Sequence, residues 1–350
     1  MVRDVDLFRE LTETSGAPGY EDRIRDIVRR EFDGVVDEVR SDTMGNVVGT
    51  IEGADRPEYE VVVAAHMDEI GFMVRHVTDD GYLQVDALGG WDARILRAQR
   101  VTVHADEGDL PGVIGSPPPH TLDEEDLDED DAVEDVFIDL GMSAAAVEDR
   151  VSKGDLVTMA QRTERVGSTL TGKSIDNRVS LYAMLQAANR VSPAVTVHFA
   201  ATVQEEVGLR GATALGVDLD PDLAIAVDTT VANDVPQIEK EADYVTVLGE
   251  GAGVKLKDSS VITNPKVHRR IQSVAETADI PYQIEILPAG GTDTAGFQTT
   301  AGAKPVGAIS VPTRYLHTPV EVAHEDDVVA VVDLLTAVLD SEDGEHDYTL

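Results

Sequence analysis

The stretch EVVVAAHMDE, residues 60–69, decides how the rest of the chain is interpreted. Residues 61–65 form a continuous apolar run, which is typical of a strand buried on both faces of a sheet. His66 and Asp68 follow that run directly, and side chains two residues apart on an extended chain point to the same side. In an open α/β sheet, ligands bind beyond the carboxyl ends of the strands. The stretch therefore predicts a central strand that ends at a functional site.

Apolar patterns on either side of this strand alternate between those of helices and those of strands. In residues 21–32 the pattern is helical, because Ile24, Ile27 and Phe32 fall on one face of a helix. Further helices are predicted over residues 177–189, 265–279 and 326–339, and further strands over residues 35–39, 46–51, 194–203, 223–227, 281–287 and 308–311. This alternation predicts an α/β sheet with helices on both faces.

Residues 71–164 break this alternation. Short apolar runs such as GFMVRHV and RVTVHA are separated by turn residues, which is typical of a small β-rich domain. We therefore expect residues 1–70 and 165–350 to form one α/β domain that residues 71–164 interrupt. An acidic loop over residues 120–135 lies within the interruption, and ten of the thirteen residues from 123 to 135 are Asp or Glu. A calcium-binding loop needs a glycine turn that this segment lacks, so we expect a solvated, mobile loop.

The composition is strongly acidic. Lys and Arg total 28, Asp and Glu total 67, and the formal net charge is −39. Because affinity for phosphate groups comes mostly from Lys and Arg, this charge argues against nucleic acid and an anionic membrane as partners. The chain has no cysteine, so it forms no disulfide, and no apolar stretch reaches the roughly 18 residues that span a membrane. Since the N-terminus lacks the apolar core of a signal peptide, we expect a cytoplasmic protein.

Charged side chains follow several other elements at the points where ligand sites collect. They are Asp176 in SIDNRVS, Glu205 and Glu206 in VQEEVG, Asp228 at the end of LAIAVD, and His317 after GAISVPTRY. Each of these residues could also have a purely structural role. A histidine could be buried in the core or a loop, the two glutamates could be a solvated pair, and an aspartate could cap a turn. Together they offer the imidazole and carboxylate ligands that two divalent metal ions sharing one carboxylate need. A further carboxylate must move a proton, and the adjacent glutamates can divide the two roles.

The order and context of these motifs carry more information than any single residue. The series HMDEIGF, SIDNRVS, QEEVGLRGA, AVDTT, GGTDTAG and RYLHTPVE resembles the TET-type (tetrahedral) aminopeptidases. These are dinuclear metallopeptidases that include the glutamyl and deblocking aminopeptidases. The resemblance extends over nearly the whole chain, from about residue 8 to residue 339, and it includes the GVIGSPPPH and FIDLG segments of the interruption.

The resemblance implies a role for each candidate residue. His66 and Asp228 would bind one metal ion, Glu206 and His317 would bind the other, and Asp176 would bridge the two. Glu205 would be the general base and acid, and Asp68 would hydrogen-bond His66 and fix its ring. Gly291, Thr292 and Asp293 would line the substrate site. The chain departs from the usual family pattern at Asn177, where a second aspartate is common, but the bridging residue before it is kept.

The resemblance also implies a fold, a cofactor and an assembly. The fold would be a mixed-sheet, phosphorylase/hydrolase-like α/β peptidase domain with an inserted, small β-barrel-like dimerisation domain. Each subunit would hold two divalent metal ions, Zn²⁺ or Co²⁺, and the homo-oligomer would be a tetrahedral dodecamer built from dimers. The substrates would be short peptides, which lose their N-terminal residue to an activated water with a Glu general base.

Other functions have distinct signatures. A dinuclear metal amidohydrolase or deacylase that acts on N-acyl amino acids would use the same site residues. A sugar hydrolase with paired carboxylates would need no metal, and a non-catalytic relative would lack a ligand or the base, none of which is missing here. The preferred N-terminal residue stays open, with a lean towards neutral, apolar side chains. Arg94, Arg178 and Lys257 are candidates for reading an acidic one.

We hypothesise that the excess of carboxylates is an adaptation to molar intracellular salt, as in a halophilic archaeon. At a net charge of −39, self-repulsion opposes the folded state in dilute buffer, and molar salt shortens the Debye length to about 3 Å. We therefore expect the melting temperature, followed by circular dichroism, to fall on dialysis from molar KCl into dilute buffer. A melting temperature that does not fall would contradict the hypothesis.

Overall fold

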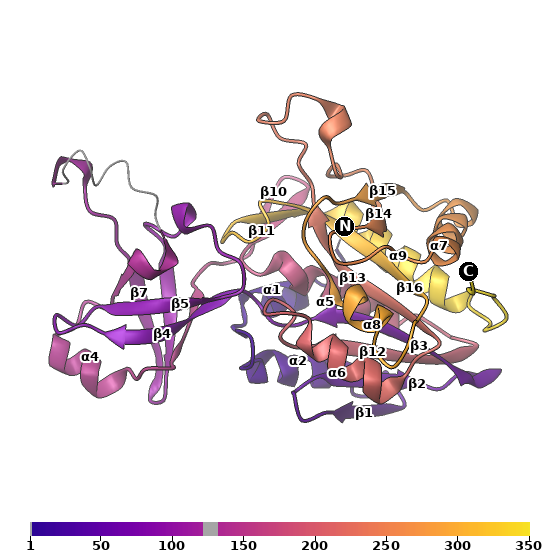
Figure 1. Cartoon of the computed structure of the whole chain (residues 1–350), viewed down its shortest axis with the longest axis horizontal. Helices are drawn as coiled ribbons and strands as arrows, with labels where there is room; N and C mark the ends of the chain where they lie inside the picture. Colours follow the sequence, from indigo (N-terminus) through magenta and orange to yellow (C-terminus); the bar gives the residue numbers. More distant parts are fainter. Residues whose placement is uncertain (1, 122–131) are drawn as a thin grey trace.

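The computed structural model describes residues 2–121 and 132–350. Their strands form an 11-stranded mixed sheet and a separate closed barrel of six strands. Figure 1 shows the barrel on one side of the molecule and the helix-covered sheet on the other. Most of the acidic loop that the sequence indicates, residues 122–131, lies outside the described residues.

Four parallel strands make the centre of the large sheet. The strand that contains the opening stretch, β3 (Arg56–His66), lies between β12 (Val195–Thr202) and β13 (Leu223–Val231). β13 in turn pairs in parallel with β16 (Val306–Arg314). All eight residues of β12 are buried, as are residues 61–66 of β3. The continuous apolar run thus forms a central strand, as predicted.

Antiparallel strands extend the sheet on both sides, so the sheet is mixed. On one side β2 (Val47–Ile51) pairs with β12, and β1 (Glu38–Ser41) pairs with β2. On the other side the order continues from β16 through β17 (Glu321–His324) and β11 (Thr169–Gly172) to β10 (Glu164–Val166). A branch joins β14 (Ala252–Lys257) to β16 and β15 (Tyr282–Ile286) to β14. The predicted mixed-sheet α/β class is confirmed.

Helices cover both faces of this sheet, and the alternation of side chains along β3 explains how. Val61, Val63 and Ala65 belong to the larger apolar core, whereas Val62 and Ala64 belong to a smaller one on the opposite face. The larger core is covered by α1 (Val5–Glu13), α2 (Asp22–Phe32), α5 (Ile175–Ala188), α7 (Pro265–Thr277) and α9 (Glu325–Asp340). The smaller core is covered by α6 (Arg210–Leu219) and α8 (Asp293–Gln298).

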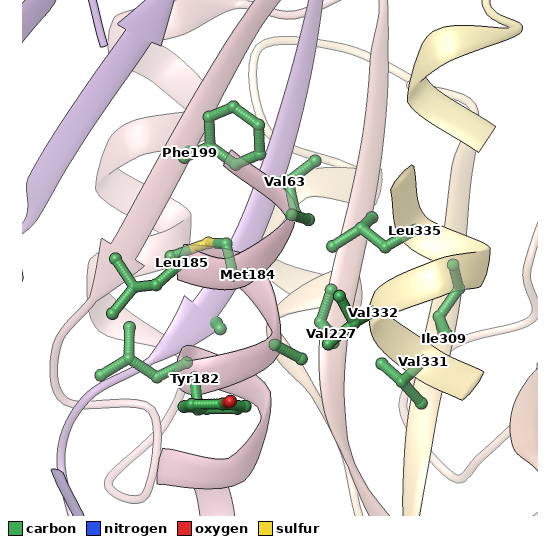
Figure 2. Close-up of a cluster of buried hydrophobic side chains, with 14 of the residues drawn as sticks. Val63, Tyr182, Met184, Leu185, Phe199, Val227, Ile309, Val331, Val332 and Leu335 are labelled. Carbon is green, nitrogen blue, oxygen red and sulfur yellow. The ribbon is translucent and has the colours of Figure 1, made fainter. Parts of the chain in front are cut away.

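The helix α5 is buried on almost all sides because it lies between the sheet and the other helices of its layer. Figure 2 shows Met184 and Leu185 of α5 together with Val63 and Phe199 from the sheet. It also shows Val331, Val332 and Leu335 of α9 packed near Val227 and Ile309. This packing holds the N-terminal end of α5 against the carboxyl edge of the central strands.

The inserted segment has its own core. Its barrel closes in the order β4 (Gly71–Val77), β5 (Leu83–Leu88), β8 (Phe137–Asp139), β7 (Gly108–Ile114), β6 (Arg100–Ala105) and β9 (Leu156–Met159), and every pair is antiparallel. Phe72, Leu83, Val103 and Ile138 are fully buried inside it. Val147 of the short helix α4 (Ala144–Arg150) completes this core. The predicted β-rich insertion is thus a closed barrel.

Several elements differ from the sequence-based expectation. The strand expected at residues 35–39 begins only at Glu38, because the N–H groups of Val35 and Val36 donate to the carbonyl of Phe32 and turn the chain. The strands expected at residues 223–227 and 308–311 are longer, since β13 and β16 pair with each other along nearly their whole lengths. Among the described residues no helix is long and apolar enough to span a membrane.

Candidate metal centre and active site

The candidate residues meet at one edge of the sheet. His66 is the last residue of β3 and lies opposite Thr202, the last residue of β12. Because these strands are parallel, Glu205 and Glu206, which follow β12, reach the same edge as His66. Asp228 reaches it from β13, and this strand continues to Val231 rather than ending at Asp228 as expected. The site is therefore assembled at the carboxyl ends of the central strands.

The other two candidates come from outside the parallel strands. Asp176 lies in the first turn of α5, where its φ of −75° and ψ of 111° depart from helical values. His317 lies in the loop between β16 and β17 and has a φ of +59°. The next residue after Asp176, Asn177, is buried, and its side-chain amide donates to the carbonyl of Val227. A carboxylate at position 177 in its ionised form could not donate this hydrogen bond.

Asp176 faces the two histidines with different oxygen atoms. Its Oδ1 lies 3.5 Å from Nε2 of His66, and its Oδ2 lies 3.6 Å from Nε2 of His317. The Nε2 of His66 also lies 3.7 Å from Oδ1 of Asp228, and that of His317 lies 3.6 Å from Oε2 of Glu206. Two groups of ligand atoms contain Asp176, namely His66–Asp176–Asp228 and Asp176–Glu206–His317, and a third group joins His66 to Glu205 and Glu206.

These distances suit metal ions. Two ligand atoms that each bind zinc at about 2.0–2.1 Å in tetrahedral geometry lie about 3.3 Å apart, close to the 3.5–3.7 Å found within each group. The donor set, two imidazoles and several carboxylates, is the one that divalent transition metals take. The residues present therefore fit a metal centre.

Buried negative charge points the same way. Burial raises the pKa of Glu206 well above its usual range, and the charge of Asp176 raises it further. Burial also raises the pKa of Asp228, against the opposing effect of His66. For His66 burial lowers the pKa, but the carboxylates of Asp176 and Asp228 outweigh this, so its pKa is raised. A site with this much clustered carboxylate charge is stabilised when cations bind it.

Both histidines have their ring orientation fixed by a main-chain carbonyl. Nδ1 of His66 lies 3.1 Å from the carbonyl oxygen of Asp68, and Nδ1 of His317 lies 2.8 Å from that of Gly90. Since a carbonyl can only accept a hydrogen bond, each Nδ1 carries the proton. Nε2 of each ring is therefore the nitrogen that can bind a metal ion.

Asp68 contacts His66 through both its main chain and its side chain. Its carbonyl oxygen lies 3.1 Å from Nδ1 of His66, and its carboxylate oxygen lies 3.5 Å from the same atom. The carboxylate also accepts the backbone N–H groups of Glu205 at 3.0 Å and Glu206 at 3.1 Å. One fully buried aspartate therefore holds both the histidine ring and the segment that carries the two glutamates.

A cleft of about 570 Å³ opens beside the centre. Gly291 and Thr292, two of the residues proposed for the substrate site, line it together with Gly290. Asp293 is not among the lining residues, because it begins α8 and its buried carboxylate accepts a hydrogen bond from the hydroxyl of Thr202. Arg178, a candidate for reading acidic substrates, is fully buried and donates to the carbonyls of Leu11 and Thr14 instead.

Sequence reasoning missed two residues that support this site. Glu321 is buried, and its carboxylate accepts the backbone N–H groups of both Asp176 and His317. Gly90 belongs to the inserted segment, yet its carbonyl orients the ring of His317. Glu321 stands in the same RYLHTPVE motif as His317, so the motif held a signal for it. Gly90 gave no such signal, because a residue of any type can offer a main-chain carbonyl.

A fold of this kind, with a histidine–carboxylate centre at the carboxyl edge of its strands, defines a metallohydrolase. The family model of the M42 glutamyl aminopeptidases matches residues 45–334, and the chain belongs to this family. The lysyl aminopeptidase of Pyrococcus furiosus is 34% identical over 345 residues, which cover 96% of this chain and 97% of that protein. The chain is accordingly a metal-dependent aminopeptidase, as the ordered motifs predicted.

Solved structures agree with this assignment. A TET aminopeptidase from a marine sediment archaeon of the Thaumarchaeota is 32% identical, with a TM-score of 0.94 over 98% of this chain and 97% of that one. The TET1 peptidase of Pyrococcus horikoshii, which can assemble into a tetrahedron or a large octahedral shell, is 30% identical with a TM-score of 0.86 over 97% and 99% of the two chains. The resemblance to the TET-type aminopeptidases is confirmed.

A buried ion pair lies directly behind the centre. Nζ of Lys173 donates to both carboxylate oxygens of Glu69 at 2.7 Å, and the N–H of Gly16 donates to one of them. Burial alone would raise the pKa of Glu69, but the charges of Lys173 and Arg178 outweigh it and lower the pKa below its usual value. The pair links the first loop of the chain to the segment that precedes Asp176.

We expect Glu69→Gln to cost about 3–5 kcal/mol of unfolding free energy near pH 7, because it leaves Lys173 buried without its counter-charge. Since the pKa of Glu69 is lowered on folding, its stabilising contribution is present above the usual value of 4.5 and is lost as the pH falls through the lowered pKa. The two stabilities should therefore converge in acid. Denaturant unfolding at several pH values in molar KCl measures this.

The matched control is the double variant Glu69→Gln/Lys173→Met, which removes the unpaired ammonium group. It should recover part of the lost stability at neutral pH. A single variant as stable as the wild type at pH 7 would contradict the assigned pairing.

Proposed function

We propose that the chain removes N-terminal residues from peptides with two divalent metal ions, Zn²⁺ or Co²⁺, held in the two groups of ligands. His66 and Asp228 would bind one ion, Glu206 and His317 the other, and Asp176 both. The observation that carries this proposal is the position of the Asp176 carboxylate, whose two oxygens face two different histidines at nearly equal distances. When bound, such ions polarise the scissile carbonyl and lower the pKa of a water molecule.

Glu205 is the residue proposed to move the proton. Its Oε2 lies 4.0 Å from Nε2 of His66, and Glu205 belongs to neither group that contains Asp176, although it could also act as a ligand together with His66 and Glu206. The hydrogen bond from its backbone N–H to Asp68 holds it at the mouth of the centre. In the reaction Glu205 takes the proton of the attacking water and later gives a proton to the departing amine nitrogen as the C–N bond breaks.

The inserted segment is proposed to be a dimerisation unit, with boundaries at residues 71–164 between the two parts of the catalytic domain. Its barrel exposes large apolar side chains, among them Tyr82, Val113 and Phe137, which are 41–44% exposed. Apolar side chains of this kind are typical of subunit interfaces. By analogy with the assembly of the TET1 peptidase, we propose a tetrahedral dodecamer built from such dimers.

The walls of the cleft suggest which residues are removed. They include the apolar side chains of Leu209, Val231, Leu287 and Leu316. Among the described residues that line the cleft, Lys255 is the only lysine or arginine, and its ammonium group is buried in an ion pair with Glu285. An acidic substrate side chain would therefore find no free counter-charge there. We propose a preference for neutral, apolar N-terminal residues.

Aminoacyl reporter substrates test the function and the preference together. In molar KCl with added Co²⁺ or Zn²⁺, leucyl substrates should be cleaved at least about tenfold faster than glutamyl ones, since the cleft leaves the glutamyl charge unpaired. Removal of metal by a chelator should abolish cleavage, and its return should restore it. The alternative, a deacylase, is not favoured by the family match; cleavage of N-acetyl-leucine but not of leucyl substrates would support it.

Exchange of Glu205 for Gln tests the proton transfer. The variant should keep both metal ions and lose at least about a hundredfold in turnover, the scale expected for a general base. Metal content by atomic emission and turnover of a leucyl substrate measure the two effects.

Asp176→Ala is the companion variant, because it removes the shared ligand and not the base. It should lose at least one metal ion per chain along with its activity. Near-normal turnover of the Glu205→Gln variant, or two ions in the Asp176→Ala variant, would contradict the assigned roles.

A further inference from the structure

The carboxylate of Glu321 connects two segments that the sheet does not hold. Glu321 is the first residue of β17 and is 2% exposed. Its Oε2 accepts the backbone N–H of Asp176 and its Oε1 accepts that of His317, both at 2.9 Å. Each oxygen thus binds the main chain of one proposed metal ligand. A single side chain sets the distance between the shared ligand and a ligand of the second ion.

These two ligands need such support more than the others do. His66 and Asp228 lie within β3 and β13, where ladder hydrogen bonds hold the backbone. Asp176, by contrast, has non-helical backbone angles at the beginning of α5. His317 adopts a left-handed φ of +59°, which residues with a side chain rarely adopt. Its side chain is also 40% exposed, so packing does little to hold it.

A second contact holds the ring of His317 from the inserted barrel segment. The carbonyl of Gly90 accepts the proton of Nδ1 at 2.8 Å. Gly90 and the His317 ring approach each other so closely that a Cβ atom added at Gly90 would lie 3.1 Å from Nδ1. His317 is therefore held at its backbone by Glu321 and at its ring by Gly90.

We infer that Glu321 is a positioning residue that sets the metal affinity of the Asp176–Glu206–His317 group. It acts through the backbone of two ligands and does not bind the ion. This inference rests on the proposed function, since it requires that this group holds one of two ions. The group His66–Asp176–Asp228 keeps two of its ligands on strands and depends less on Glu321.

The test is the stepwise affinity for Co²⁺ of the full-length chain, followed by the absorption of the bound ion and by metal analysis after dialysis. In Glu321→Gln, one carboxylate oxygen becomes an NH₂ group that cannot accept an N–H. We expect one of the two stepwise affinities to fall about 10–100-fold, the usual effect of losing a group that orients a ligand. The affinity for the other ion should change much less.

Glu325→Gln is the matched control. Glu325 is also a buried glutamate, 3% exposed, and its carboxylate accepts the backbone N–H of Val2 and pairs with Arg165 away from the centre. It should lower the melting temperature without changing either Co²⁺ affinity. A merely structural role for Glu321 would give the same pattern in both variants.

A second variant keeps the test decisive if Glu321→Gln does not fold. Gly90→Ala adds one methyl group beside Nδ1 of His317 and should lower the affinity for the same ion. Gly115→Ala is its control, because nothing lies within 4 Å of the added Cβ atom there.

The outcomes separate the two proposals. If the wild-type chain binds two ions and the Glu321 and Gly90 variants bind both with unchanged affinity, the inference is wrong and the proposed function stands. If the wild-type chain itself binds fewer than two ions, the proposed function is wrong and the inference fails with it. Selective loss of one affinity in the variants, absent from both controls, supports the inference.

Discussion

Repulsion between carboxylates at the carboxyl edge of the sheet is the constraint around which this structure is organised. Asp176, Glu205, Glu206 and Asp228 converge within reach of two imidazoles, and their side chains are largely buried. Such a group is unstable by itself, because each buried charge disfavours the next. The fold brings the carboxylates together only because strands, helix packing and buried hydrogen bonds hold every segment in place. Bound cations would then offset the repulsion between these carboxylates.

Two buried acids share the work of holding that arrangement. Asp68 accepts two backbone N–H groups on one side of the centre, and Glu321 accepts two on the other. In both cases the acid binds main chain and leaves the charged side chains of the site free to point inward. Carboxylates in this protein therefore fall into three classes. Many lie on the surface, a few converge at the centre, and at least two hold the segments that carry the residues of the centre.

The sequence was informative where chemistry depends on residue type. The apolar run before His66 predicted a central strand, and the polar residues after the strand ends predicted the edge where the site lies. The sequence was less informative where packing or main-chain atoms determine the structure. The helix α6 was not predicted, because it carries Gly211 and Gly216, which disfavour helix; in the structure its Ala212 and Leu215 pack in one core with Phe297 of α8. Asp293 was expected in the cleft, but the turn into α8 buries its side chain.

The carbonyl of Gly90 has a consequence for the independence of the two parts of the chain. The barrel closes on its own core, and in outline it resembles a module that could be removed or exchanged. Yet the tautomer of His317 is selected by an atom from the loop that follows β5. A shortened chain that keeps only the large sheet and its helices would retain all the proposed ligands and lose the group that orients one of them. If His317 is a ligand, we expect the smallest active unit of this protein to include the loop of Gly90, and a barrel transplanted from a relative to work only when it brings a carbonyl to the same position.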